Sequence, residues 1–353
     1  MNTSHPTSYR PSQTGIIAGL VTTIIPVYNR SDMLVQAVQS VLDQDYRPIE
    51  IIIVDDGSTD DTLLTAQQLA QEWPDEIIVL RQPNSGPGVA RQYGLDHAQG
   101  EFIQYLDSDD LLLRTKFSRQ VEMLRRYQDC QICYAISHDQ IVRDGLAPSQ
   151  FPTKGTGEYQ PSLFPRLLVE RWWSTNTPLY RHEILRSIGP WEPLINEEDW
   201  EYDARLAALN VKLAWVPESL SIKRWLSVEQ HLSNEGTSDP VKLRHRASAR
   251  DSIYRSALLA GISHDCPEML HFAHSAFLMA RECCNAGLSH EAAGLLRLAS
   301  QAGHRDSRIL RDIRLFRLMV LLLGCRRAVR VSEKLHRFRR SHLNLHESSS
   351  SSS

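Results

Sequence analysis

The chain has 353 residues, enough for one enzyme-sized domain and a smaller second module. It carries 39 lysines and arginines against 42 aspartates and glutamates, so its formal net charge is −3 at pH 7. This slightly acidic balance argues against general binding to nucleic acid, because such binding needs a positive surface that neutralises phosphates.

The N-terminus, from Met1 to Gln13, is polar and lacks the apolar core of a signal peptide. The C-terminus ends in a run of serines from Ser348 to Ser353. We expect both ends to be disordered, over residues 1–17 and 341–353. Without a secretory signal, the protein is expected in the cytoplasm.

The first predicted strand runs from Leu20 to Ile25 and is expected to stop at Pro26. The next helix is predicted from Asp32 to Leu42. Between them, Tyr28 can stack on a nucleic base, although an aromatic residue at a strand end more often belongs to the core.

A second strand, Ile49 to Val54, is rich in β-branched residues and leads into an acidic turn. Part of this turn has a local explanation. Gly57 permits the bend, and Ser58 with Asp61 can form a capping box for the helix predicted over Thr62 to Trp73. That explanation leaves the first two aspartates of the turn, Asp55 and Asp56, without a role. They lie where a base or a ribose hydroxyl can donate hydrogen bonds to them.

The segment from Asn84 to Arg91 is a flexible turn, with Gly86 at its centre, that opens a helix. Such a turn can bring backbone amides and Arg91 toward an anion. It contains neither Gly-x-Gly-x-x-Gly nor Gly-Lys-Ser/Thr, so neither a dinucleotide-binding turn nor a nucleoside-triphosphate loop is supported.

A third strand, Glu101 to Leu106, ends at three acids: Asp107, Asp109 and Asp110. In open α/β sheets ligands bind at the carboxyl ends of the strands, and oxygen ligands suit a hard cation such as Mg²⁺ or Mn²⁺ shared with a phosphate. The alternative is structural, since aspartate and serine form turns and cap helices, and Leu111 to Tyr127 is predicted to be helical.

Signals weaken downstream. Trp172 and Trp173 can line a sugar-binding face, or one can be core and the other edge. The acids from Asn196 to Tyr202 are compatible with a solvated first turn of a helix from Asp199 to Leu209. The six cysteines include one Cys-x-x-Cys pair, Cys130 with Cys133, but no second pair that would complete a zinc site, so we expect reduced, mostly buried thiols.

The C-terminal part, Pro240 to Arg340, is predicted to be a helical appendage. Pro267 to Gly303 resembles one tetratricopeptide-like hairpin, broken near Gly287, and one copy does not make a solenoid. From Arg305 to Arg340 arginine recurs, and the apolar stretch Leu315 to Gly324 is too short to span a bilayer. This pattern predicts a basic amphipathic helix on an anionic membrane; the alternative is a helix packed on its neighbours with a solvated basic face.

The order of these motifs, from the Pro26 to Asn29 turn to the Asp107 to Asp110 turn, resembles that of the family 2 glycosyltransferases, which are inverting enzymes with a glycosyltransferase A-type fold. The resemblance is strong over Gly19 to Leu113 and looser as far as Ser233. It implies an α/β fold of the nucleotide-diphospho-sugar transferase kind, Rossmann-like, with a mixed, mostly parallel sheet flanked by helices. We expect the catalytic domain over 18–238 and the α-helical appendage over 239–340.

What the resemblance implies can be carried onto single positions. The donor, a nucleotide-diphosphate sugar that is usually UDP-linked, would contact Pro26, Tyr28, Asn29, Asp55, Asp56, Gly86, Arg91, Asp107 and Arg224. Asp107 and Asp109 would form the Asp-x-Asp element, with Asp109 as direct metal ligand and Asp107 nearer the ribose. Asp110 would either orient that ligand or cap the next helix.

Two downstream elements also match loosely. Asp199 aligns with the general base, with Glu198 as the alternative. His231, in a loop that would close over the diphosphate, would contact the metal or a phosphate. The processive Gln-x-x-Arg-Trp element is missing, and Lys223 to Trp225 is only a fragment of it. We therefore expect transfer of one or a few sugars.

The expected reaction is a metal-assisted single displacement at the anomeric carbon, with an aspartate as base and a saccharide or lipid-linked acceptor, in synthesis of cell-surface glycans. A peripheral contact of 305–340 with the inner face of the cell membrane would suit such an acceptor. One alternative is a catalytically idle relative that binds a nucleotide-sugar, or a partner through its helical module. A sugar nucleotidyltransferase would need a glycine-rich, basic first loop, which Gly19 to Arg30 lacks.

Overall fold

The computed structural model describes residues 15–141, 151–225 and 239–334. The chain forms two compact units that alternate along the sequence. The sheet unit consists of Met1–Gln160, Trp173–Pro193 and Lys212–Trp225. The helical unit consists of Pro161–Trp172, Leu194–Val211 and Leu226–Ser353. Residues 161–172 and 194–211, which we expected in one domain with the sheet, thus belong to the helical unit.

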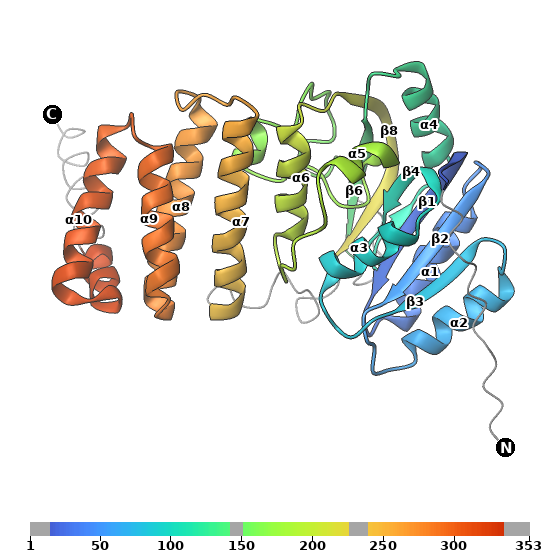
Figure 1. The fold of residues 1–353 in the computed structure, drawn as a ribbon, viewed down its shortest axis with the longest axis horizontal. Coiled ribbons are helices and arrows are strands. Elements are labelled where there is room, and N and C mark those ends of the chain that lie inside the picture. Colours follow the sequence, from blue (N-terminus) through green and yellow to red (C-terminus); the bar gives the residue numbers. More distant parts are fainter. Residues whose placement is uncertain (1–14, 142–150, 226–238, 335–353) are drawn as a thin grey trace, which may run out of the picture. The chain divides into compact units, whose positions relative to one another are not determined.

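The sheet unit is built on one mixed sheet (Figure 1). Its strands are β1 (Ile17–Val27), β2 (Ile49–Asp55), β3 (Ile77–Arg81), β4 (Gly100–Tyr105), β5 (Leu111–Leu112), β6 (Ile132–Ile141), β7 (Leu179–Arg181) and β8 (Leu213–Trp225). Their order across the sheet is β3-β2-β1-β4-β7-β6-β8-β5. The first four are parallel, and β7 runs antiparallel to both of its neighbours. The predicted fold class, a mixed and mostly parallel sheet with helices, is confirmed.

Helices follow most of these strands. They are α1 (Ser31–Leu42), α2 (Thr62–Glu72), α3 (Pro87–His97), α4 (Lys116–Arg126) and α5 (His182–Ser187). The strand β2 is buried along its whole length because its β-branched residues face apolar neighbours on both sides. On α1, Leu34, Ala37, Val38 and Val41 recur at helical spacing and complete the same core.

Three local expectations were wrong. The strand β1 continues through Pro26, which pairs in register with Val54. Leu111 and Leu112 are not helical, because they pair with β8 as a short strand, and the helix begins only at Lys116. The capping box on α2 does not form, since Ser58 Oγ accepts a hydrogen bond from the Asn29 amide at 3.0 Å instead.

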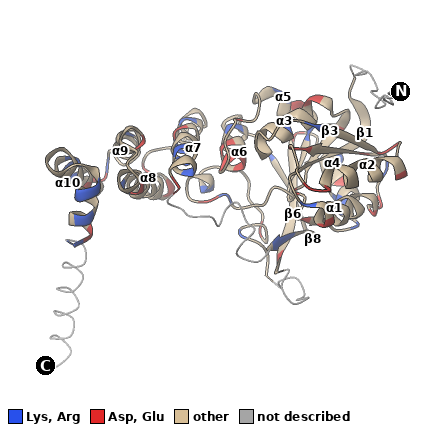
Figure 2. Cartoon of the chain, turned by 90° about the horizontal axis from the view of Figure 1, so that it is seen from below, with Lys and Arg blue, Asp and Glu red and all other residues tan. Residues whose placement is uncertain are grey.

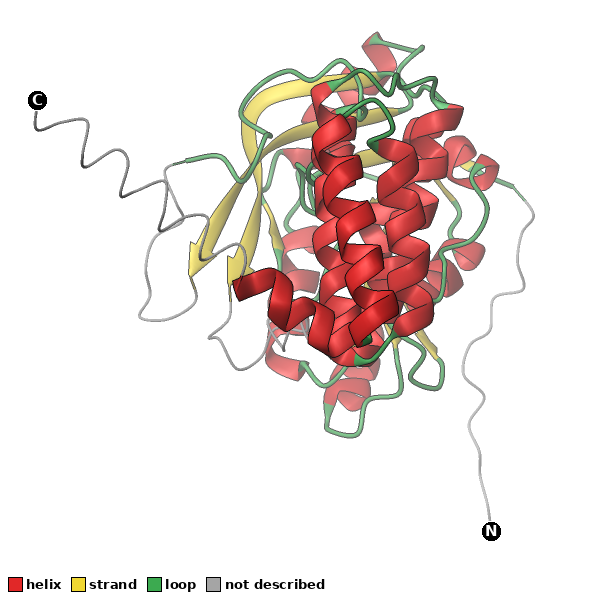
Figure 3. Cartoon of the chain, turned by 90° about the vertical axis from the view of Figure 1, so that its left-hand side faces the viewer, coloured by secondary structure: helices red, strands yellow, loops and turns green. Residues whose placement is uncertain are grey.

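The helical unit contains α6 (Glu198–Ala208), α7 (Pro240–Leu259), α8 (Pro267–Ala286), α9 (Ser289–Ala302) and α10 (Ser307–Leu323). Neighbouring helices lie side by side (Figures 1 and 3). The predicted hairpin is present as α8 and α9, and Gly287 ends α8 in the left-handed conformation at φ 84°. It packs against α7 and α10, so apolar faces that one hairpin leaves uncovered are buried by further helices.

Neither tryptophan of the adjacent pair lies at a surface. Trp172 in the helical unit and Trp173 in the sheet unit are both fully buried, so both earlier interpretations, a sugar-binding face and a core-and-edge pair, were wrong. All six cysteines are free thiols, as expected, and four of them are buried. Burial raises the pKa of Cys283 to about 11 and that of Cys284 to about 12, which makes them poor nucleophiles.

Candidate functional site

An acidic edge lies at the carboxyl end of β4. Asp107, Asp109 and Asp110 each present a carboxylate oxygen, and these oxygens lie within 4.8 Å of one another. The strand reaches this edge beside β1, since the Leu106 amide donates to the carbonyl of Ile24 at 3.0 Å. The three acids that follow this strand in the sequence therefore also lie close together in space.

Asp110 forms the buried base of this edge. Its Oδ2 accepts a hydrogen bond from Asn176 Nδ2 at 3.0 Å, and its Oδ1 accepts one from the backbone amide of Arg224 at 2.9 Å. Burial, followed by the charges of Asp109 and Asp107, raises its pKa well above the usual range. It does not cap the next helix, because the residue that precedes α4 is Thr115. Asp110 thus links the end of β4 to Asn176 and to Arg224 at the end of β8.

Three arginines converge on the same edge. Arg91 Nη2 lies 2.7 Å from Asp107 Oδ1, and its guanidinium stacks 4.9 Å above the ring of Trp191. Arg30 Nη1 contacts Asp109 Oδ2. Arg224 donates from Nε to the backbone carbonyl of Asp109, and among the described residues its buried Nη2 has no hydrogen-bond partner. The edge therefore presents both carboxylates and guanidinium donors.

A second acidic turn lies at the end of β2. Asp55 is fully buried; its Oδ1 accepts from the Ser58 amide at 3.3 Å, and Arg81 Nε lies 3.5 Å from its Oδ2. Oδ2 accepts no hydrogen bond from the residues that the structure describes. Asp55 therefore retains an acceptor oxygen next to the end of β1.

Asp56 has a different environment from Asp55. Its Oδ1 accepts from Gln82 Nε2 and from the Ser85 amide, both at 2.8 Å, and its Oδ2 accepts from the Gly86 amide at 2.9 Å. These bonds fasten the turn that opens α3, with Gly86 at φ 90°. Asp56 therefore fixes the backbone of Gly86 and the start of α3.

The turn after β1 contacts the second acidic turn. Tyr28 is 43% exposed, so the interpretation as a core aromatic was wrong. Asn29 adopts the left-handed conformation at φ 51°, and its Oδ1 accepts from the Thr59 amide at 2.8 Å. Pro26 is buried inside β1, directly before this turn, and pairs with Val54 of β2. An exposed aromatic face is thereby fixed next to Asp55.

The acidic start of α6 lies in the helical unit. Arg171 Nη1 is 2.8 Å from Asp199 Oδ2, and Arg171 Nε is 2.6 Å from Asp203 Oδ2. Glu197, in the left-handed conformation, receives Arg246 at 3.0 Å and Arg250 at 3.3 Å. The first turn is thus held by guanidiniums, and its interpretation as simply solvated was wrong.

The two candidates for the base differ in exposure. The side chain of Asp199 is 29% exposed, whereas Glu198 is only 7% exposed. A base must reach the acceptor proton, so the exposure favours Asp199.

Arg224 lies at the end of β8, with Lys223 Nζ 4.4 Å above the ring of Trp225. His231 lies outside the described residues.

Sequence reasoning missed Arg30, Asn176 and Arg171 as partners of the predicted site residues. Arg30 directly follows the Asn29 turn, and its charge at a strand end facing two acidic turns was an available signal. Asn176 carried no such signal, because it binds Asp110 from 66 positions away.

The residues of the acidic edge fit a divalent cation. Asp107 and Asp109 offer hard oxygen ligands and remain partly exposed, which are the properties that Mg²⁺ and Mn²⁺ prefer. Both oxygens of Asp110 are already occupied by neutral donors. The geometry therefore suits Asp107 and Asp109 as ligands, whereas Asp110 fastens the end of β4 to Asn176 and β8.

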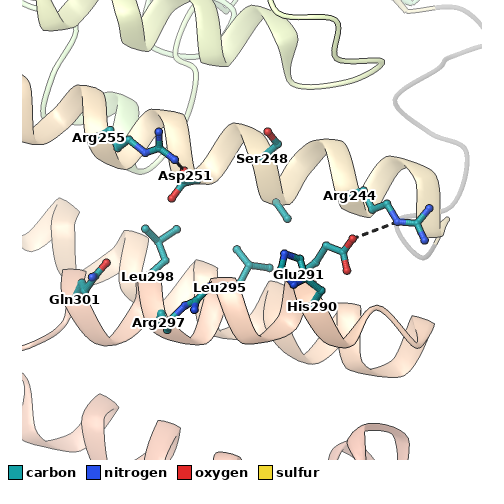
Figure 4. A pocket seen from close by; sticks show the side chains of 12 residues that line it. Arg244, Ser248, Asp251, Arg255, His290, Glu291, Leu295, Arg297, Leu298 and Gln301 are labelled. Carbon is teal, nitrogen blue, oxygen red and sulfur yellow. Dashed lines mark hydrogen bonds and ion pairs between the residues drawn. The ribbon is translucent and has the colours of Figure 1, made fainter.

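The helical unit has a groove of about 530 Å³ between α7 and α9 (Figure 4). Leu295 and Leu298 lie along it. Its two acids are already engaged, Glu291 with Arg244 at 3.2 Å and Asp251 with Arg255. The groove shows no arrangement of acid, base and nucleophile that would mark a catalytic site.

Comparison with known proteins agrees with this geometry. The family model "Glycosyl transferase family 2" matches residues 22–186. An uncharacterized glycosyltransferase of Nostoc sp. is 34% identical over 234 residues, which cover 64% of this chain and 71% of that protein. The putative teichuronic acid biosynthesis glycosyltransferase TuaG of Bacillus subtilis is 36% identical over 132 residues, which cover 37% and 52%. The chain spans only 23% of the length of a relative from Rickettsia felis.

Solved structures share the fold. S. aureus TarS 1–349 in complex with UDP superposes with a TM-score of 0.56 and 17% identity, over 83% of this chain and 89% of that one. The mannosyltransferase PcManGT of Pyrobaculum calidifontis, in complex with GDP-Man and Mn²⁺, gives a TM-score of 0.50 and 19% identity, over 93% and 90%. From these sequence and fold relationships, the chain belongs to glycosyltransferase family 2.

Proposed function

We propose that this protein is an inverting glycosyltransferase that moves a sugar from a nucleotide-diphosphate sugar, with UDP as the expected nucleotide, to an acceptor hydroxyl. The observation that carries the proposal is the meeting of Asp55, Asp107, Asp109 and Arg224 at one edge of the sheet. The strands β2, β4 and β8 run in the same direction without being neighbours in the sheet, and they deliver a nucleoside-binding acid, two cation ligands and a guanidinium donor to that edge.

Donor binding follows from the contacts at this edge. The buried Oδ2 of Asp55 can accept a hydrogen bond from the base, and the exposed ring of Tyr28 can stack on it. The unpartnered Nη2 of Arg224 can donate to the diphosphate. A divalent cation held by Asp107 and Asp109 would, when bound, stabilise the negative charge that develops on the leaving diphosphate.

The transfer itself is a single displacement. The acceptor oxygen forms a bond to the anomeric carbon while the bond from that carbon to the diphosphate oxygen breaks, so the configuration inverts. Asp199 takes the proton of the acceptor hydroxyl. Arg171, which binds Asp199 and Asp203 together, fixes the direction of this carboxylate. General-base assistance of this kind contributes about 10²- to 10⁴-fold to the rate.

The function is tested by thermal shift of the purified protein with UDP, GDP and dTDP and with their sugars, each with and without Mn²⁺. We expect UDP with Mn²⁺ to raise the melting temperature most, because ligands that bind the folded state stabilise it. Asp109→Asn should abolish the cation-dependent part of the shift, while Asp61→Asn, in the neighbouring turn, should leave it intact. Absence of any shift from folded wild-type protein would point to the idle relative.

A membrane contact is part of the proposal. None of the described helices is both long and apolar enough to cross a membrane. The inner face of α10 buries Ile309, Ile313 and Phe316, whereas Leu321 is 82% and Leu322 is 72% exposed. Seven arginines flank these leucines in the sequence, at positions 308, 311, 314, 317, 326, 327 and 330. Those of α10 are blue in Figure 2. Exposed leucines flanked by arginines match an anionic lipid surface.

This contact is tested by flotation with lipid vesicles. Wild-type protein should float with vesicles that contain phosphatidylglycerol and not with pure phosphatidylcholine. The double variant Leu321→Glu, Leu322→Glu should stay at the bottom of the gradient. Leu259→Glu on α7 is the matched control, because Leu259 is 77% exposed in the same unit and should not affect flotation. Equal flotation of the double variant would exclude the contact.

A further inference from the structure

Arg30 contacts the acidic edge from the start of α1. It precedes α1, and its Nη1 contacts Oδ2 of Asp109, the carboxylate that we assign to the cation. Its backbone amide donates to Thr62 Oγ1 at 2.9 Å. The main chain is therefore anchored independently of the guanidinium.

A second guanidinium lies close to the first. Arg224 donates from Nε to the carbonyl of Asp109 and from Nη1 to Gln36 Oε1. Asp109 thus binds two guanidiniums, that of Arg30 at its carboxylate and that of Arg224 at its backbone carbonyl.

A guanidinium and a divalent cation compete for one carboxylate, because like charges a few ångströms apart repel strongly in a partly buried site. Either cation can satisfy Asp109, and the presence of one weakens the hold of the other. An anionic diphosphate at this edge would offer Arg30 another partner. Drawing Arg30 away from Asp109 would then favour the cation, and by linkage the cation would favour the diphosphate to the same extent.

We propose that Arg30 links cation binding to donor binding: it occupies Asp109 in the empty site and leaves this carboxylate for the diphosphate when the cation and the nucleotide bind. The inference rests on the proposed donor site. It makes Arg30 a positioning residue whose removal should improve cation binding in the absence of nucleotide.

The test is a titration with Mn²⁺ followed by the electron paramagnetic resonance signal of the free ion, first without nucleotide and then with saturating UDP. Arg30→Gln should bind Mn²⁺ about tenfold more tightly than wild type without nucleotide, a typical size for such a coupling. UDP should strengthen Mn²⁺ binding to both proteins, because its diphosphate can ligate the ion, but by a smaller factor in the variant than in wild type; a titration of UDP without protein gives the Mn²⁺ that free UDP binds. Arg30→Lys keeps the charge and should stay near wild type.

Arg81→Gln is the matched control. It removes one positive charge at the neighbouring strand end, where Arg81 Nε lies 3.5 Å from Asp55, without touching Asp109. We expect its Mn²⁺ affinity without nucleotide to stay within about twofold of wild type, because the charge lies beyond the acidic edge. Equal gains for Arg30→Gln and Arg81→Gln would overturn the inference, since they would reflect net charge alone.

Asp109→Asn distinguishes a failure of the proposed cation site from a failure of the proposed role of Arg30. If this variant loses Mn²⁺ binding while Arg30→Gln behaves as wild type, the donor site stands and the role of Arg30 is overturned. If Asp109→Asn binds Mn²⁺ as well as wild type does, the cation assignment falls and the role of Arg30 falls with it. Melting curves of each variant confirm that the fold is intact.

Discussion

The buried carboxylate of the acidic edge in the sheet unit and the acids at the start of α6 in the helical unit are fixed by different kinds of partner. At the edge, the innermost carboxylate, Asp110, is held by neutral donors, an amide side chain and a backbone amide. At the start of α6, guanidiniums hold the acids: Arg171 binds Asp199, and Arg246 binds Glu197.

Neutral and charged partners have different consequences for the carboxylate that they hold. Neutral hydrogen bonds set the position of Asp110 without adding a positive charge, and the guanidiniums of the edge contact Asp107 and Asp109 instead. A guanidinium partner fixes the direction of a carboxylate through a rigid, forked set of donors. That suits a base, for which orientation toward one proton matters most.

The largest effect is expected at α6. Asp199→Asn should lower the transfer rate by about 10²- to 10⁴-fold, because the amide cannot accept the acceptor proton. The thermal shift with UDP and Mn²⁺ should be unchanged, since donor contacts lie in the sheet unit. Asp251→Asn, on α7, is the control and should retain full transfer. Weakened UDP binding with an intact rate would instead move the base to Glu198.

A smaller effect is expected at the neutral hydrogen bond of the edge. Asn176→Ala leaves the buried Oδ2 of Asp110 without its donor, so we expect the free energy of unfolding to fall by about 1–3 kcal/mol. Urea denaturation measures this change, and the exposed Asn285→Ala provides a comparison of similar chemistry. An unfolding curve equal to wild type would show that the Asn176 bond does not fix the edge.

The smallest effect concerns a buried cation with neutral partners. Lys116 Nζ donates to Gln120 Oε1 at 2.6 Å and to the Thr177 carbonyl at 2.8 Å, and burial lowers its pKa to about 7 from 10.5. Between these values the unfolded chain binds a proton that the folded chain does not, so the free energy of unfolding rises with pH. From pH 7 to pH 8, wild type should gain about 1 kcal/mol relative to Lys116→Met.

The control for this pH dependence is Lys212. It is exposed and bound to Asp129 at 2.8 Å, and that hydrogen bond raises its pKa. Lys212→Met should therefore leave the change of unfolding free energy between pH 7 and pH 8 as in wild type. A constant difference between wild type and Lys116→Met across this range would show that Lys116 is charged in the folded protein.

Much of the sheet unit could be predicted. The strands at β1, β2 and β4 were placed within a few residues, because buried strands need continuous apolar runs and the turns after them carry their own chemistry. The hairpin of α8 and α9 was found for the same kind of reason, since its break at Gly287 is a local signal. The predicted roles of the site residues remain proposals.

The errors share a physical cause. Leu111 and Leu112 have helical neighbours in sequence, but pairing with β8 made them a strand. Ser58 had the spacing of a capping residue, yet the Asn29 amide competed for its hydroxyl. In both cases a partner from a distant segment offered a better hydrogen bond than the local one.

The sequence by itself determined which residues form the acidic turns and that these turns follow buried strands, because periodicity and turn chemistry act over a few neighbouring positions. Only the tertiary structure decided which partners those acids meet. Asp110 receives Asn176 from 66 positions away and Arg224 from 114 positions away. Such partners are brought together by the order of strands in the sheet, which is set by packing of the whole core and leaves no local mark in the chain.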